Sequence, residues 1–120
     1  MRKQIVIGFS GLLCCASIQA NEAAGIDALA DVYYRFEVAA AYCGVVNDQA
    51  IAGYYVERGQ IVEKFSLSKA DQINASGIAS QAAHKEWQNR GLGGFKPWCR
   101  TEGRAYADQF LQQLAPQSGQ

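Results

Sequence analysis

The chain has 120 residues, in which eleven Lys and Arg residues are balanced by eleven Asp and Glu residues. A nucleic-acid-binding domain of this size is normally net basic, so the balance argues against nucleic acid as a partner. The length fits one domain, large enough to bury a hydrophobic core without a structural metal. No internal repeat, low-complexity tract or linker divides the sequence.

The N-terminus has the three parts of a secretory signal peptide. Two cations, Arg2 and Lys3, precede an apolar run from Ile5 to Leu13, and small or polar residues follow as far as Ala20. The apolar run is too short to span a membrane, which takes about 20 apolar residues in a helix. We therefore predict that residues 1–20 are a signal peptide that is cleaved after Ala20.

Three alternatives for the N-terminus stay open. Cleavage after Ala16 is one of them, because Ile18 is larger than the residue usually found at the third position before the cut. Lipid attachment at Cys15 is the second, although the preceding Leu13 and Cys14 fit the small-residue requirement of such a site poorly. An uncleaved membrane anchor is the third.

Removal of residues 1–20 leaves nine basic and eleven acidic residues, a net charge of −2 with His84 neutral. No other apolar stretch approaches the length of a membrane span, so we expect no transmembrane segment after cleavage. We predict that the mature protein is periplasmic or secreted. Its helical domain occupies residues 21–116, and the polar tail, residues 117–120, is expected to be disordered.

The two cysteines that remain after cleavage are Cys43 and Cys99. They are too far apart for a C-x-x-C redox pair or a zinc knuckle. In an oxidising compartment such a pair is expected to form a disulfide. Closing a loop of this size stabilises a fold by about 4 kcal/mol in the chain-entropy model.

Apolar residues recur at steps of three and four in four segments, as expected for amphipathic helices. The first segment runs from Ile26 to Cys43, and Gly44 is suited to end it. The second is capped by residue 47 or 48 and continues to Phe65. Gly59 weakens this second helix and could divide it into two pieces.

The third predicted helix starts with Ser68 and Asp71, whose spacing approximates a capping box, and it ends at Gly91. Its expected inner face consists of mostly small residues, which let a neighbouring helix approach closely: Ile73, Gly77, Ile78, Ala82 and Ala83. The fourth helix has Pro97 in its first turn and ends at Pro116. Its expected buried residues are Cys99, Tyr106, Phe110 and Leu114.

Short connections favour antiparallel neighbours, so the sequence predicts an all-α fold, a small four-helix up-down bundle. In that topology the end of the first helix and the start of the fourth lie at the same pole. Cys43 and Cys99 occupy these two places. The expected topology and the expected disulfide therefore support each other.

No motif in the sequence indicates catalysis, a cofactor or a metal. His84 is the single histidine, whereas a zinc site needs three or four ligands. Ser80 lies four residues before His84 and could form a Ser–His dyad, but no motif supplies the orienting acid or the oxyanion hole. The glycines between residues 91 and 94 lack the spacing of a phosphate loop. We therefore predict a protein that is not an enzyme and binds no cofactor.

Aromatic and basic residues gather at the pole of the predicted disulfide, a composition typical of binding hot spots. The candidate partner-binding residues are Trp87, Arg90, Phe95, Lys96, Trp98 and Arg100. The structural alternative is that they pack over the disulfide and hold the glycine-rich loop.

The sequence thus predicts an exported interaction module that binds a protein or a cell-envelope component without catalysis. The alternatives are a periplasmic stress chaperone and a small hydrolase that uses His84.

Overall fold

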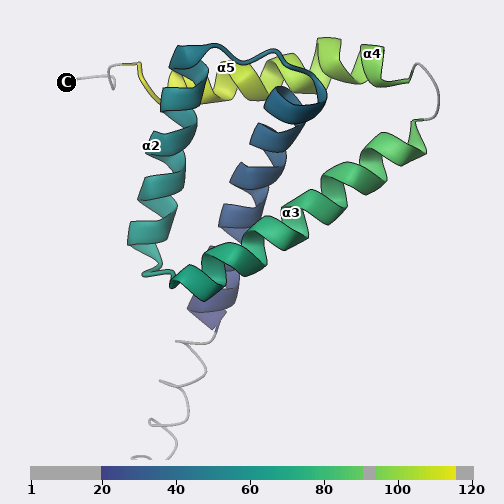
Figure 1. The fold of residues 1–120 in the computed structure, drawn as a ribbon. Coiled ribbons are helices and arrows are strands. Elements are labelled where there is room, and N and C mark those ends of the chain that lie inside the picture. Colours follow the sequence, from purple (N-terminus) through teal and green to yellow (C-terminus); the bar gives the residue numbers. More distant parts are fainter. Residues whose placement is uncertain (1–19, 91–93, 116–120) are drawn as a thin grey trace, which may run out of the picture.

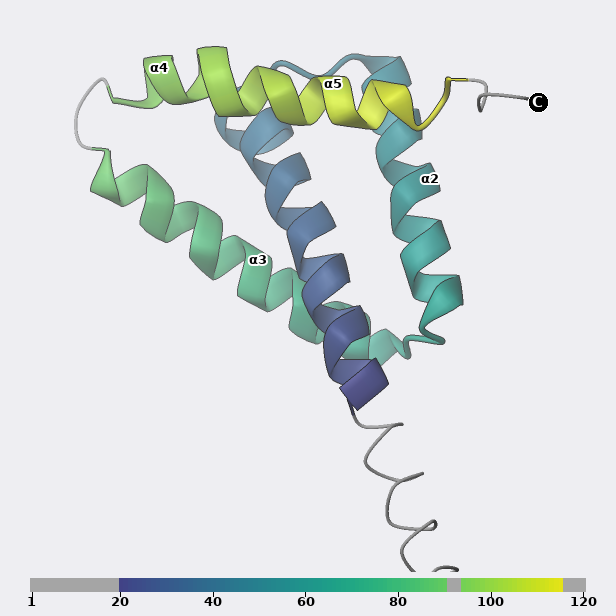
Figure 2. The same cartoon turned by 180° about the vertical axis from the view of Figure 1, so that it is seen from behind.

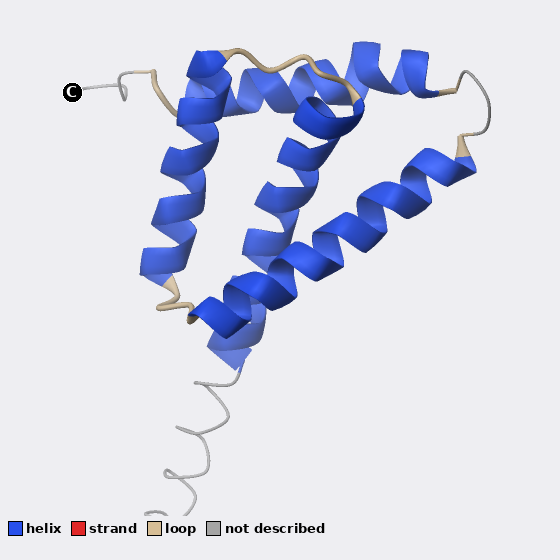
Figure 3. Ribbon diagram, in the orientation of Figure 1, coloured by secondary structure: helices blue, strands red, loops and turns tan. Residues whose placement is uncertain are grey.

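The computed structural model describes residues 20–90 and 94–115, and it is helical almost throughout (Figure 3). No strand occurs within these two ranges. The prediction of an all-α fold with four helices is confirmed. The predicted signal peptide, except for its last residue Ala20, and the predicted disordered tail lie outside the described residues.

The first helix is the centre of the fold. It is already helical at residue 20, whereas the sequence predicted a start at Ile26. The first turns are exposed and carry no apolar pattern, so the spacing of apolar residues did not reveal them. An α-helix runs to residue 36 and continues as the π-helix η1 (Glu37–Tyr42). Gly44 follows with a φ of 62°, a left-handed conformation that costs glycine least.

Helix α2 (Asp48–Lys64) is capped by Asn47, whose side chain accepts a hydrogen bond of 2.8 Å from the backbone N–H of Ala50. The helix is continuous through Gly59, so Gly59 does not break it. Gly53 lies where α2 meets the C-terminal helix, and a Cβ there would be 1.8 Å from the carbonyl oxygen of Phe110. This glycine permits a close approach of the two helices.

Helix α3 (Lys69–Asn89) begins with the predicted capping box: Ser68 and Asp71 each accept a hydrogen bond from the backbone N–H of the other, at 3.1 and 3.0 Å. Of the predicted inner face only Ala83 is buried, so the predicted register is wrong. Ile73 and Ile78 are 67% and 44% exposed, and Gly77 and Ala82 are exposed as well. The buried residues of α3 form an alanine stripe at every fourth position: Ala75, Ala79 and Ala83.

The C-terminal stretch is helical from α4 (Phe95–Trp98) through the π-helix η2 (Cys99–Gly103) to α5 (Arg104–Gln112). Pro97 lies in its first turn, as predicted. Phe110 is fully buried, but Leu114 is 44% exposed and does not belong to the buried face. The stretch lies across the ends of the first helix and α2. Helix α3 starts beside the other end of α2 and runs away from it towards α4 (Figures 1 and 2).

Three clusters of buried side chains follow one another along the first helix. The cluster nearest the start of the first helix joins Leu29 to Leu67 and Ala75, and the next one joins Val32 to Tyr54 and Phe110. The third joins Val38 to Ala83 and Trp98. The first helix contributes to every cluster, so α2 and α5 pack against one side of it and α3 against another.

Candidate functional site

The predicted disulfide is present. Cys43 caps η1 and Cys99 opens η2, and the sulfurs are bonded with the two Cα atoms 5.2 Å apart. Gly103, one turn after Cys99, packs against the bridge: a Cβ there would be 2.9 Å from the Sγ atom of Cys43. The disulfide therefore ties the end of the first helix to the start of the C-terminal stretch.

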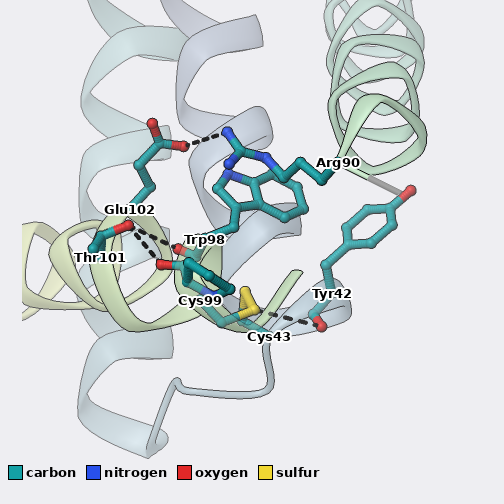
Figure 4. Close-up of a disulfide and its surroundings, with 8 residues drawn as sticks. Tyr42, Cys43, Arg90, Trp98, Cys99, Thr101 and Glu102 are labelled. Carbon is teal, nitrogen blue, oxygen red and sulfur yellow. Dashed lines mark hydrogen bonds and ion pairs between the residues drawn. A yellow bond between two sulfur atoms is a disulfide. The ribbon is translucent and has the colours of Figure 1, made fainter. Parts of the chain in front are cut away.

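Two of the six residues predicted to bind a partner are part of the packing. Trp98 is 1% exposed and belongs to the third core cluster. The guanidinium of Arg90 lies 4.8 Å from the Trp98 ring and pairs with Glu102 at 3.5 Å (Figure 4). It also pairs with Glu86 at 2.7 Å. Trp98 is therefore not available to a partner, and Arg90 already has two acidic partners.

The other four predicted residues are exposed, namely Trp87, Phe95, Lys96 and Arg100. Trp87 is 44% exposed and Phe95 is 40% exposed. The Trp87 ring lies 5.8 Å from the His84 ring and 6.0 Å from the Tyr42 ring. These four residues are a smaller candidate surface, which we call the disulfide-end surface.

Ser80 and His84, the possible Ser–His dyad, are not bonded to each other. The Ser80 hydroxyl donates a 3.1 Å hydrogen bond to Glu37, whereas His84 stacks on Trp87. Within the described ranges, no three His, Cys, Asp or Glu side chains are grouped closely enough to hold a metal ion. The helices of the same ranges include none that is long and apolar enough to cross a membrane.

A groove that the sequence analysis missed lies between the first helix, α2 and α3. It has a volume of about 600 Å³, and the first helix contributes Tyr33, Phe36, Glu37, Ala40 and Ala41 to its lining. Helix α2 contributes Tyr54, Tyr55 and Arg58, and α3 contributes Ser76 and Ser80. A second hollow of about 200 Å³ shares Tyr33, Arg58 and Ser76 and reaches Lys69, Gln72 and Ile73. We call the two together the tyrosine groove.

Aromatic side chains give the tyrosine groove its apolar surface. The rings of Phe36 and Tyr54 stack with their centroids 3.8 Å apart, and Tyr55 lies 5.0 Å from Tyr54. Tyr55 itself is 60% exposed. Burial raises the pKa of Tyr54 to about 12, so its phenol stays protonated to a higher pH than that of an ordinary tyrosine. Such rings offer both apolar area and a polar group at the tip.

Arg58 is a cation that lines both hollows of the tyrosine groove, and its hydrogen-bond partners are neutral. It donates from Nε to the Tyr33 hydroxyl at 3.0 Å and from Nη2 to the Gln72 side-chain oxygen at 2.9 Å. The hydrogen bond to Tyr33 raises the pKa of Arg58. Among the described residues, none of the carboxylates is within 4.0 Å of the Arg58 guanidinium. The side chain is thus held in place while its charge is not neutralised by an ion pair.

The sequence carried a weak signal for this groove. The doublets Tyr33–Tyr34 and Tyr54–Tyr55 point to rings at the flanks of two helices, but which flanks face each other depends on how the helices pack. Comparisons with protein-family models, with curated proteins and with solved structures find no match for this chain.

Proposed function

We propose that the protein is an exported binding module that holds a protein or a cell-envelope component without catalysis. The observation that carries the proposal is Arg58, which is oriented by Tyr33 and Gln72 and lacks an acidic partner among the described residues. A cation held only by neutral groups in an open groove is suited to bind an anionic group from outside, because an arginine–carboxylate contact carries opposite charges on both partners, whereas the contacts to Tyr33 and Gln72 carry a charge on one partner only. The tyrosine groove is therefore our principal candidate site.

The export part of this proposal rests on the N-terminal sequence. Cleavage after Ala20 gives a mature protein that starts at Asn21, and the intact mass of protein recovered from the envelope or the medium measures this directly. Retention of Met1 in that material would contradict the proposed localisation.

Site-specific photo-crosslinking tests the groove whatever the identity of the partner. A photo-reactive side chain in place of Tyr55, at the rim of the groove, is expected to give a discrete adduct in the producing cells. Val56 is the matched control, because it is the next residue of α2, is 37% exposed and does not line the groove. The adduct should be lost in the Arg58→Gln variant. Equal adducts from positions 55 and 56, or none from either, would overturn the groove as the binding site.

The disulfide-end surface is a second place where a partner could bind, because it carries exposed Trp87 and Phe95. Arg100→Ala and Lys69→Ala separate the two surfaces, since Arg100 belongs to the disulfide-end surface and Lys69 to the tyrosine groove. Loss of the adduct at position 55 in Lys69→Ala but not in Arg100→Ala supports the groove. The opposite result would move the site to the disulfide end.

A further inference from the structure

We infer that the tyrosine groove takes a short peptide with free ends, whose C-terminal carboxylate pairs with Arg58 and whose N-terminal ammonium pairs with Glu37. This inference rests on the proposed function and specifies the ligand of the same site. It follows from the opposite charges that the lining holds, from the length of the floor and from the aromatic rings.

The cationic part of the tyrosine groove combines Arg58 with Lys69. Both side chains line the smaller hollow, and Lys69 is exposed. A guanidinium presents several N–H donors in a plane and binds carboxylates in a defined orientation. Since Nε and one terminal nitrogen already donate to Tyr33 and Gln72, the other terminal nitrogen of Arg58 has no bond to a described side chain and can donate to a ligand.

The anionic part of the tyrosine groove is Glu37, the first residue of η1. Its carboxylate accepts one hydrogen bond, from the Ser80 hydroxyl at 3.1 Å. No Lys, Arg or His of the described ranges is within 4.0 Å of it. Cation and carboxylate thus line one groove without pairing with each other, which complements a ligand that carries both charges.

The floor of the groove sets the length of the ligand. Its two charged groups are bonded to side chains eight positions apart on α3, Arg58 to Gln72 and Glu37 to Ser80, and eight residues of this α-helix advance about 12 Å. An extended peptide advances about 3.3 Å per residue. The floor therefore accommodates about three residues, and a longer peptide has to leave the groove at one end.

The rings define the preferred side chain of the ligand. Tyr55 is exposed and lies beside the stacked pair of Phe36 and Tyr54. An aromatic side chain of the peptide can add to this row in an offset or edge-to-face arrangement. A polyanion such as a nucleic acid fits less well, because Glu37 repels it.

The test is a calorimetric titration of the mature protein with the tripeptide Ala-Phe-Ala in four forms: free, N-acetylated, C-amidated and blocked at both ends. The free form should bind most tightly. Loss of one charged pair should weaken binding about tenfold, and the doubly blocked form should bind weakest. Inorganic phosphate alone should not displace the free tripeptide at equal concentration.

Matched variants assign each end of the peptide. Arg58→Gln should lose most of its preference for the free over the amidated peptide, while still discriminating against the acetylated one. Arg58→Lys should recover part of the preference for a free carboxylate. Glu37→Gln should show the converse pattern. Arg104→Gln and Glu63→Gln are the controls, because both residues are exposed and lie outside the groove, and they should behave as the wild type.

Equal affinities for the four peptide forms, or an Arg58→Gln variant with unchanged discrimination, would overturn the inference. If no form binds while the adduct at position 55 still depends on Arg58, the peptide is wrong and the proposed function stands. If the peptides bind as described but no cellular adduct forms, the ligand class stands and the wider function fails.

Discussion

Two arginines, Arg35 of the first helix and Arg58 of α2, are held in opposite ways on two sides of the molecule. On the side that faces α2 and α5, Arg35 is buried with 9% exposure and pairs with Asp31 at 2.9 Å and with Glu57. On the side that faces the groove, Arg58 is held by a phenol and an amide. We call these the closed side and the open side.

The difference follows from how much contact with water each arginine side chain loses on folding. Burial lowers the pKa of Arg35, but the hydrogen bond and the charge of Glu57, together with Asp31, outweigh it and raise the pKa overall. Gln109 of α5 accepts a further hydrogen bond of 3.2 Å. The hollow beside this cluster, about 530 Å³, is therefore lined by a charge that is already satisfied. Arg58 keeps access to water and can exchange that water for a ligand.

The largest expected effect comes from removing the disulfide. We assign the disulfide to the closed side, because Cys99 opens η2 and η2 continues directly into α5. The Cys43→Ser/Cys99→Ser double variant should lose about 4 kcal/mol of unfolding free energy, since the cross-link constrains the unfolded chain. Urea unfolding followed by circular dichroism measures the loss. Two titratable thiols in the exported wild-type protein would contradict the bond itself.

The two arginines should differ clearly when each is truncated. Arg35→Ala leaves Glu57 mostly buried without its cation, which costs about 3 kcal/mol. Arg58→Ala removes two hydrogen bonds to neutral groups, which costs about 1 kcal/mol. The same unfolding measurement compares the variants, and equal losses would remove the distinction between the two sides.

Two glycines of α2 sharpen the comparison within one helix. Gly53→Ala should destabilise by about 2 kcal/mol, because the added methyl group meets the Phe110 carbonyl and overpacks the contact with α5. At Gly59 no atom lies within 4 Å of an added Cβ. Gly59→Ala should therefore stabilise by up to about 1 kcal/mol through helix propensity. Thermal melting of both variants should give shifts of opposite sign.

An effect that depends on pH concerns Tyr54, which packs on Phe110 of the closed side and lines the groove. Its pKa is raised by burial to about 12 from the ordinary 10, so the unfolded chain ionises first. The stability that this provides is complete below pH 10 and is lost as the pH rises through 12. Wild type should lose roughly 1 kcal/mol from this group by pH 11. Tyr54→Phe should lose that much less between pH 9 and pH 11, and identical losses would refute the burial argument.

Local chemistry determined much of the fold independently of how the helices pack. The Ser68–Asp71 capping box and the Pro97 start depend on nearby backbone groups. Cys43 and Cys99 are 56 positions apart, and their pairing was predicted because no other cysteine lies beyond the predicted signal peptide. Because these features need little information about distant parts of the chain, the sequence predicted them correctly.

Only the tertiary structure decided which helix faces meet. The alanine stripe of α3 packs inward while Ile73 and Ile78 remain exposed. Alanine side chains let the helices approach closely, although each of them buries little apolar area. Trp98 turns into the core. Arg58 and Glu37 come from different helices and line one groove. No periodicity within one helix specifies such a meeting, since it depends on the angles at which three helices cross.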